Sequence, residues 1–433
     1  MKLSGWGRYP RIDAQIIAPA DLPALAAGAA RLPPQTIARG LGRSYGDSAL
    51  AATVIDTRHL DHFITFDATS GVLVCQSGAT LAEILAVAVP QGWFLPVTPG
   101  TRFVTLGGAI ASDVHGKNHH LHGSFCDYIQ SLRLFTASAG IVHCARDAEP
   151  ELFAATCGGM GLTGVIVEAS LQLKPIAGAF IEQTSIKAAN LDAAFELFEA
   201  HGDASYSVAW IDCLAQGDNL GRAIVSLGEH ASSGELSTGS DTTLSAPFTT
   251  PGWLLNNWSM RAFNYLYYHR MRDMRRHSRV HYVPFFYPLD GIRHWNRLYG
   301  GDGFVQYQCV LPRAAGREGM AALLQCIAAS GKGSFLAVLK ALGKGNGNLL
   351  SFPMEGYTLA LDFRMERDIL PLLDELDAMV IDHGGRIYLT KDARMSQATF
   401  RACYPNWNNF CEIRRAWGAD KHFNSLQSQR LGL

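Results

Sequence analysis

One stretch of the chain, residues 99–124, constrains the fold and the function more than any other. It reads PGTRFVTLGGAIASDVHGKNHHLHGS, with paired small residues, four histidines and an isolated lysine, Lys117. Gly-Gly flanked by Thr and Ser lets the backbone approach a ligand closely and present N–H groups to a phosphate. A turn-rich surface loop and a metal-binding histidine cluster are the alternatives, but no Cys or Glu pair stands at a ligand spacing. The stretch therefore predicts a cofactor-binding loop and no metal site.

Two more glycine-rich turns stand beside β-type runs. The first, at 38–50, reads ARGLGRSYGDSAL and follows a predicted strand, and the second, GGMGLTG at 158–164, precedes another. Residues 159–164 have the spacing GxGxxG, but they precede a predicted strand and do not follow one into a helix, and no turn contains GxxxxGK[ST]. A dinucleotide Rossmann site and a P-loop are therefore disfavoured.

Composition narrows the class of protein. The chain has 433 residues, of which 48% are hydrophobic and 17% charged, and this suits a globular protein of two or three domains. A formal net charge of −1 provides no global field to attract nucleic acid. Nine cysteines without a CxxC pair predict no disulfide framework. Because the sequence shows neither a secretory signal nor a long apolar run, we expect it in the cytoplasm or at the periphery of the inner membrane, with the membrane face left open.

Hydrophobic periodicity predicts alternating helices and strands. Thr80 and Glu83 have the spacing of a capping box, which marks the start of a helix. We expect helices at 20–32, 80–89, 151–155, 317–329 and 369–383 and a helix starting at 105–109. We expect strands at 35–38, 54–56, 64–66, 72–75, 132–135, 141–144, 165–173, 206–212, 304–310 and 357–363. The amino-acid composition changes near residue 178, where we place a domain boundary. The Ser/Thr/Gly-rich residues 228–252 predict a mobile loop.

A basic and aromatic run extends from Met260 to Tyr282. It reads MRAFNYLYYHRMRDMRRHSRVHY. Such a run is typical of a solvated helix face, and it also suits a surface that meets anionic lipid headgroups. RNA binding is a third alternative, and the sequence leaves the three open.

Taken together, several motifs resemble one family. ARGLGRSYGD, PGTRFVTLGGAIASDVHGKNHH, GGMGLTG, FVQYQ and LTKDAR resemble the flavin oxidoreductases of the vanillyl-alcohol oxidase type, nearly from end to end of the chain. Within that family the chain most resembles the branch that oxidises a polyprenyl-phosphoryl ribose at its 2′-hydroxyl. The resemblance implies an α+β fold with a two-part FAD-binding domain, residues 1–178 with 386–433 returning to it. An antiparallel-sheet substrate domain would occupy 179–385.

The resemblance also implies which residues embrace the FAD. They come from the first two glycine-rich stretches and two later positions: Ala38, Arg39, Gly40, Leu41, Gly42, Arg43, Ser44, Tyr45, Gly46, Asp47, Ser48, Gly100, Thr101, Thr105, Leu106, Gly107, Gly108, Ser112, Asp113, Val114, His115, Gly116, Ile166 and Tyr388. Many relatives bind FAD covalently through a histidine in the first turn. Here that turn reads Gly42-Arg43-Ser44-Tyr45, so we predict a non-covalent flavin.

Oxidation of a secondary alcohol needs a hydride acceptor, a base for the hydroxyl proton and positive charge near the reduced ring. Lys391 is the first candidate, either as that charge or, with a lowered pKa, as a proton acceptor. A strand-end lysine paired with Asp392 is the alternative. The resemblance adds four further catalytic candidates: His115, Lys117, Gln308 and Tyr45.

Two glutamines point to a sugar. Gln306 and Gln308 lie on one face of the predicted strand 304–310, where both can hydrogen-bond one sugar or simply mark a wet face. The resemblance places further substrate contacts at Lys117, Trp210, Tyr287, Lys340, Thr358 and Ala360, although core packing competes for each aromatic. Mycobacterial relatives carry Cys where this chain has Ala360 and Asn where it has Thr358. Thiol chemistry is therefore lost at that strand, and the substrate geometry is expected to differ.

The leading hypothesis is FAD-dependent oxidation of a polyprenyl-phosphoryl-β-D-ribose to its 2′-keto form. A separate NAD(P)H-dependent keto-reductase would complete an epimerisation to the arabinose donor for arabinan of the cell wall. The second hypothesis is a soluble aldose, alditol or sugar-lactone oxidase that uses O2. A flavin-binding scaffold without turnover is the third, and Lys391 and His115 argue against it.

Overall fold

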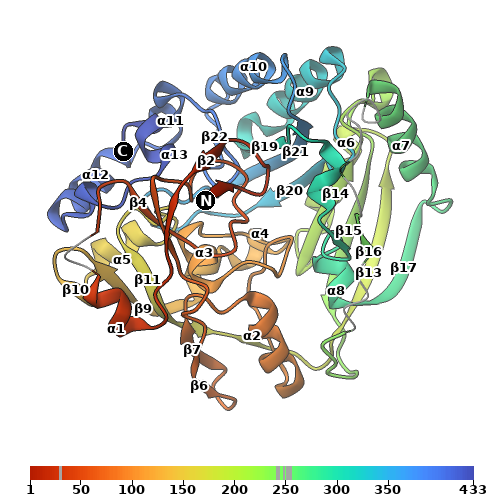
Figure 1. Cartoon of the computed structure of the whole chain (residues 1–433). Helices are drawn as coiled ribbons and strands as arrows, with labels where there is room; N and C mark the ends of the chain where they lie inside the picture. The colour runs from red at the N-terminus through yellow and green to blue at the C-terminus, as the bar shows by residue number, and fades with distance from the viewer. Residues whose placement is uncertain (29–31, 240–243, 247–248, 250–255) are drawn as a thin grey trace.

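The computed structural model describes residues 1–28, 32–239, 244–246, 249 and 256–433 (Figure 1). Its N-terminal part contains a small parallel sheet in the order β3-β5-β4, formed by Gln15–Ile17, Thr53–Asp56 and Thr36–Arg39. Helix α1 (Leu22–Ala27) lies between β3 and β4 in the chain. The first glycine-rich turn begins where β4 ends, as the sequence predicts.

A five-stranded antiparallel sheet stands beside it in the order β10-β9-β11-β7-β6. Its strands are Gly140–Ala145, Ile129–Thr136, Val165–Gln172, Val72–Gln76 and Phe63–Asp67. Helix α2 (Leu81–Ala88) starts at the predicted capping box, in which Thr80 and Glu83 bond each other's backbone. Helix α3 (Leu106–Ala111) is capped by Thr105 and packs on β11. Two further helices, α4 (His119–His122) and α5 (Pro150–Thr156), complete this part.

An eight-stranded antiparallel sheet forms the other half of the molecule. Its order is β17-β13-β15-β14-β20-β21-β19-β22, formed by Arg275–His281, Phe180–Ala188, Ala223–His230, Tyr206–Ile211, Val338–Leu342, Gly356–Arg364, Phe304–Pro312 and Arg386–Ile387. Helices α6 (Leu191–Ala200), α9 (Arg313–Ser330) and α10 (Ile369–Asp382) cover one face of this sheet (Figure 1). The opposite face is turned toward the N-terminal half, and its polar side chains are therefore available to a ligand.

The C-terminal segment packs on the N-terminal half. It contains helices α11 (Gln397–Cys403), α12 (Trp407–Ala416) and α13 (Leu426–Leu431). The N–H of Thr36 donates to the His422 carbonyl at 2.8 Å, and Arg430 bonds Asp47 at 2.8 Å. The division into domains at 178 and 386 stays a prediction, which these contacts support.

The remaining elements are short. They are β1 (Lys2–Ser4), β2 (Arg11–Asp13), β8 (Trp93–Phe94), β12 (Lys174–Pro175), β16 (Leu244–Ser245), β18 (Ile292–Arg293) and α8 (Tyr282–Phe286), with 3-10 turns at Val89–Gln91, Phe125–Tyr128, Gly217–Asn219, Trp295–Tyr299 and Ala419–Lys421. No helix within the described ranges combines the length and the apolar composition needed to cross a membrane.

Two predictions about the sheet half need correction. The predicted mobile loop 228–252 begins inside strand β15, because Gly228 to His230 pair with Ile181 to Gln183 of β13, and 240–243, 247–248 and 250–252 lie outside the described residues. The run 260–282 is not one helix: α7 (Asn257–His269) ends before strand β17. The arginines of β17 stand on an edge strand, where charged side chains are common.

Candidate active site

A large cavity lies between the two halves. Its volume of about 1340 Å³ exceeds the roughly 300–1,000 Å³ of ordinary ligand pockets. Residues of all three glycine-rich turns line one side of it, including Gly42, Gly108 and Gly161. The turns are far apart in sequence, so the cavity exists only in the folded chain.

The other side of the cavity is the free face of the eight-stranded sheet. Six neighbouring strands each contribute two side chains separated by one residue: Gln183 and Ser185, Ile224 and Ser226, Val208 and Trp210, Val338 and Lys340, Ala360 and Asp362, Gln306 and Gln308. This spacing follows from the two-residue period of a strand. The predicted sharing of one face by Gln306 and Gln308 is thereby confirmed.

The first glycine-rich turn offers unused backbone donors. Within the described residues, the N–H groups from Gly40 to Ser44 have no hydrogen-bond partner, and all five residues line the cavity. A Cβ on Gly40 would lie 2.2 Å from the Thr105 hydroxyl, so only glycine lets this turn meet the second one so closely. A cradle of this kind fits the phosphates of a dinucleotide.

The second turn works differently from what its sequence suggests. The N–H of Gly107 already donates to the Ser77 carbonyl at 2.8 Å, and that of Gly108 to the Thr105 hydroxyl at 3.2 Å. These amides therefore serve the helix start and are not free for a phosphate. Both glycines still line the cavity, where they permit close approach of a ligand.

Two orphaned polar atoms mark the cavity wall as a ligand site. Among the described residues, the buried Ser77 Oγ and His115 Nδ1 have no hydrogen-bond partner, and both residues line the cavity. A Cβ on Gly100, another lining residue, would meet only open space. Buried polar atoms normally have partners, so these positions fit a polar cofactor held between the turns.

A hydrogen-bond chain fixes the tautomer of His115. The Thr358 hydroxyl donates to the Cys309 carbonyl at 2.8 Å, so it must accept the 3.2 Å bond from Gln308 Nε2. The same amide group then donates to His115 Nε2 at 2.9 Å, which leaves the proton on Nδ1. Burial, helped by the nearby charge of Lys340, holds the pKa of His115 well below its usual value. His115 is therefore a neutral ring with a free Nδ1–H donor.

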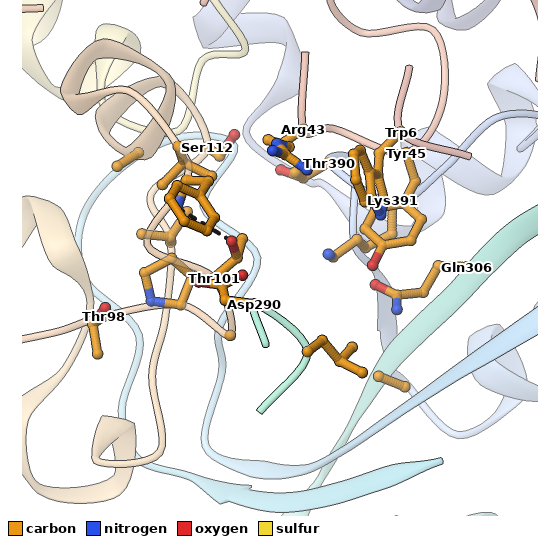
Figure 2. Close-up of a pocket in the computed structure, with 18 of the residues that line it drawn as sticks. Trp6, Arg43, Tyr45, Thr98, Thr101, Ser112, Asp290, Gln306, Thr390 and Lys391 are labelled. Carbon is orange, nitrogen blue, oxygen red and sulfur yellow. Dashed lines mark hydrogen bonds between the residues drawn. The ribbon is translucent and has the colours of Figure 1, made fainter. Parts of the chain in front are cut away.

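Lys391 lines the same cavity with the Asp362 carboxylate nearby. Its Nζ is 4.0 Å from the centre of the Tyr45 ring, and Figure 2 shows Lys391, Tyr45 and Gln306 grouped on one side of the cavity. Burial lowers the pKa of Lys391 to about 7, the Asp362 carboxylate opposes this shift, and Lys340 adds to it. Burial also raises the pKa of Asp362 to about 7, although Gln306 donates to it at 2.5 Å. The pair can therefore hold or release a proton near neutral pH.

Two more lysines make the cavity suitable for an anion. Burial lowers the pKa of Lys117 to about 7, and the charge of Lys340 adds to this shift. The Lys117 ammonium group donates to the Phe285 carbonyl and lies 4.3 Å from the centre of the Phe285 ring. Burial lowers the pKa of Lys340 to about 8. An anionic ligand would restore the charged forms of both.

Most predicted site residues line this one cavity. They are Ala38 to Tyr45, Ser48, Gly100, Thr101, Thr105, Gly107, Gly108, Ser112, Val114 to Lys117, Ile166, Trp210, Gln306, Gln308, Lys340, Ala360, Tyr388 and Lys391. Lys391 is thus a cavity residue rather than a strand-end lysine, and Asp392 pairs with Arg430 at 2.8 Å instead. The individual roles of these residues stay predictions.

Six predicted site residues lie behind the cavity wall. Gly46 contacts the Asp392 backbone, Asp47 bonds Arg430, Leu106 is in the core, and Asp113 accepts bonds from three side chains around Ser351. Tyr287 is 1% exposed and bonds the Thr98 hydroxyl at 2.7 Å, so it does not offer the expected direct substrate contact. Thr358 accepts a hydrogen bond from Gln308, as described above. These residues support the site from outside it.

Sequence reasoning missed Asp362, Trp6 and Asp290, which also line the cavity. Asp362 follows Thr358 and Ala360 at the period of a strand, so alternation was a usable signal for it. Trp6 stacks on Arg43 at 4.0 Å, and Figure 2 shows it beside Tyr45. Trp6 and Asp290 lie outside the glycine-rich turns; Asp290 is three residues from the predicted Tyr287, but no local pattern marks either residue as part of the cavity.

Comparisons with known proteins agree with this geometry. Residues 18–145 match the FAD binding domain family. The chain is 35% identical to decaprenylphosphoryl-beta-D-ribose oxidase of Mycolicibacterium smegmatis over 453 aligned positions, which cover all of this chain and 97% of that protein. The chain belongs to the decaprenylphosphoryl-β-D-ribose oxidase family.

Two other relatives show how much of the chain is shared more widely. An uncharacterized protein of Streptomyces coelicolor is 34% identical over 372 positions, 82% of this chain and all of that protein. L-gulonolactone oxidase 5 of Arabidopsis thaliana is 30% identical over 129 positions, only 28% of this chain and 22% of that protein. As a member of the decaprenylphosphoryl-β-D-ribose oxidase family, the chain is an FAD-dependent oxidoreductase, and the predicted cofactor and α+β class with antiparallel sheets are confirmed.

Proposed function

We propose that this protein oxidises the 2′-hydroxyl of a polyprenyl-phosphoryl-β-D-ribose to the 2′-keto form. The observation that carries the proposal is the end-to-end similarity to a decaprenylphosphoryl-beta-D-ribose oxidase, since it spans both walls of the cavity. The L-gulonolactone oxidases match less than a third of this chain, so the alternative of a soluble sugar-lactone oxidase rests on a smaller part of the site.

The cavity has the chemistry that such a substrate requires. The sheet face offers the amides of Gln306 and Gln308 to sugar hydroxyls, and Lys117 and Lys340 to a phosphodiester. Both lysines are poorly solvated, which makes an anionic ligand favourable there. A neutral sugar alone would leave these two charges uncompensated.

FAD, when bound, supplies the acceptor for the hydride that leaves the carbinol carbon. The protein has to hold the sugar, exclude water and accept the hydroxyl proton. Lys391 is our proton acceptor, because a pKa near 7 leaves part of its amine unprotonated at neutral pH. Once protonated, the ammonium group favours negative charge that develops beside it.

His115 and Tyr45 position these groups. Neutral His115 keeps its Nδ1–H pointed away from Gln308, as a donor for cofactor or substrate. Tyr45 supports the Lys391 ammonium group with its ring face. Its backbone N–H donates to the Thr390 carbonyl at 3.0 Å, which ties the first glycine-rich turn to the segment that carries Lys391.

The chemistry of the product and of the substrate indicates which partners the protein needs. A 2′-keto sugar on a lipid phosphate calls for a separate NAD(P)H-dependent keto-reductase if the reaction is to complete an epimerisation to the arabinose donor. A polyprenyl chain on the substrate calls for contact with a membrane surface. We propose both partners.

Anaerobic flavin bleaching tests the proposed function. Purified holoenzyme should lose its yellow flavin absorbance with a polyprenyl-phosphoryl ribose but keep it with xylitol or gulonolactone. Bleaching by the free sugars alone would replace the proposal with the soluble-oxidase alternative. A protein that takes up no flavin would remove both.

A further inference from the structure

Helix α7 (Asn257–His269) carries large apolar side chains on its exposed face. Its most buried residue is Asn264, with no exposed surface, whereas Trp258 is 84% exposed and Leu266 67% exposed. Tyr265 is 53% exposed and follows Trp258 by seven residues, so the large apolar side chains form one outward stripe. In Figure 1 the helix lies at the outer margin of the sheet half.

Met260, buried in the core, and several polar contacts hold the helix on the sheet without the stripe. Asn264 Nδ2 donates to Asp212 at 2.8 Å, and Asp212 also pairs with Arg222 at 2.7 Å. Arg261 adds a bond to the Leu214 carbonyl. The outward stripe is therefore not needed to fold the helix, and exposed apolar patches of this kind mark interaction sites.

The segment that contains the stripe and strand β17 is basic, which favours one kind of partner. Residues 257–281 contain six arginines and one aspartate, although the whole chain has a net charge of −1. Arg279 lies 3.5 Å from Glu182, but among the described residues Arg272 and Arg275 form no ion pair, and both are exposed. Trp and Tyr beside several Arg is the composition of segments that lie in the headgroup region of an anionic bilayer.

The same segment borders the cavity. Tyr267, Arg270 and Met271 line it, and the Tyr267 ring lies 4.6 Å from that of Trp210 on the sheet face. One side of the segment thus faces the proposed substrate, and the other carries the exposed stripe. A ligand with a sugar phosphate at one end and a polyprenyl chain at the other would pass between them.

We propose that the stripe of Trp258, Tyr265 and Leu266, with Arg272 and Arg275, docks the protein on an anionic lipid bilayer and sets the cavity opening against it. The choice of a bilayer rests on the proposed function, in which the substrate is lipid-linked. The docking itself needs neither substrate nor turnover, so it can be measured separately.

Vesicle flotation of the holoenzyme tests the docking. The protein should float with vesicles of phosphatidylglycerol and phosphatidylcholine and stay behind with phosphatidylcholine alone or in high salt. Trp258→Ser with Leu266→Ser, and separately Arg272→Gln with Arg275→Gln, should each lower the bound fraction about tenfold or more. Ile64→Ser with Val87→Ser, on exposed apolar side chains of the other half, is the matched control and should float like wild type.

Three outcomes would overturn the docking. They are a wild-type protein that ignores the anionic vesicles, a double variant that floats as well as the control, and a dimer in size-exclusion chromatography that the Trp258→Ser change dissolves. Flavin bleaching by a short-chain, water-soluble substrate should be unchanged in both double variants. Vesicle binding without bleaching by any polyprenyl-phosphoryl ribose would contradict the proposed function and leave the docking intact.

Discussion

Lys391 is the residue with the most direct chemical task in the cavity. Replacement by Ala removes the proposed proton acceptor but leaves the glycine-rich turns untouched. We expect Lys391→Ala to retain FAD and to slow flavin bleaching by substrate by about 100-fold or more, the usual worth of a general base. Stopped-flow anaerobic bleaching measures this rate. Lys421→Ala, an exposed lysine far along the chain, is the control, and a Lys391→Ala protein that bleaches at the wild-type rate would remove Lys391 from the mechanism.

The pH dependence of the same step reports the neighbours of Lys391. Its unprotonated amine increases as the pH rises through about 7, so bleaching should accelerate over that range. Asp362 raises the pKa of Lys391 and Lys340 lowers it. Asp362→Asn should therefore move the midpoint to lower pH and Lys340→Gln to higher pH. Single-turnover rates measured from pH 5 to 9 would decide, and shifts in the same direction in both variants would refute this electrostatic account.

Substitutions at Thr358 test whether the hydrogen bonds from Thr358 through Gln308 to His115 affect the rate of flavin bleaching. Thr358→Val keeps the shape but removes the hydroxyl that orients Gln308, so His115 loses its fixed tautomer. We expect bleaching to slow about tenfold, which corresponds to the ~1–2 kcal/mol of one misplaced hydrogen bond. Thr358→Ser should restore most of the rate. Equal losses in both variants would point to packing instead.

The site residues differ in how well the sequence predicts them. Gln306 and Gln308 could be found because strand alternation and motif resemblance both point to them, and Lys391 because it stands in the LTKDAR motif. The role of Thr358 could not, because it depends on a bond between neighbouring strands β19 and β21. The amides of Gly107 and Gly108 were misjudged for a similar reason, since their acceptor at Ser77 and their cap at Thr105 are set by folding.

At the scale of elements, local signals predicted local structure. The capping box of Thr80 and Glu83 specified the start of α2 without help from the rest of the fold. Strand β20 (Val338–Leu342), which carries Lys340, was missed because its sequence does not alternate and its place is defined by its pairing with β21. The split of 260–282 into α7 and β17 was missed although the charge changes where the helix ends: α7 contains one arginine, and residues 270–281 contain five.

An ionic clamp, formed by Arg430 with two carboxylates, ties helix α13 (Leu426–Leu431) to the rest of the molecule. Arg430 bonds both Asp47 and Asp392 at 2.8 Å, and both carboxylates are buried. Arg430→Ala would leave two buried carboxylates without this partner, and we expect a loss of about 3–5 kcal/mol in the free energy of unfolding. Urea denaturation of the holoenzyme measures it. Arg415→Ala, on an exposed position of α12, should cost less than about 0.5 kcal/mol, and equal losses in the two variants would contradict the clamp.

At the scale of the molecule, the cavity is a property of the whole chain. Its walls come from the N-terminal turns, the eight-stranded sheet and the segment after β22, so a ligand that fills it would contact parts that are far apart in sequence. No sequence pattern gives the distance between those walls. The family resemblance did give their pairing, since it joins the motifs from both ends of the chain.

A ligand that bridges these parts should stabilise all of them at once. At a free FAD concentration 100 times its dissociation constant, the stabilisation is about 3 kcal/mol. Removing FAD should therefore lower the unfolding temperature of the protein, and adding FAD back should restore it, as differential scanning calorimetry can measure.

Because Gly42-Arg43-Ser44-Tyr45 offers no histidine for attachment, acid precipitation should release all of the flavin into the supernatant. Flavin that stays with the precipitated chain would contradict the non-covalent site, and an unfolding temperature indifferent to FAD would contradict a cofactor held between the two halves.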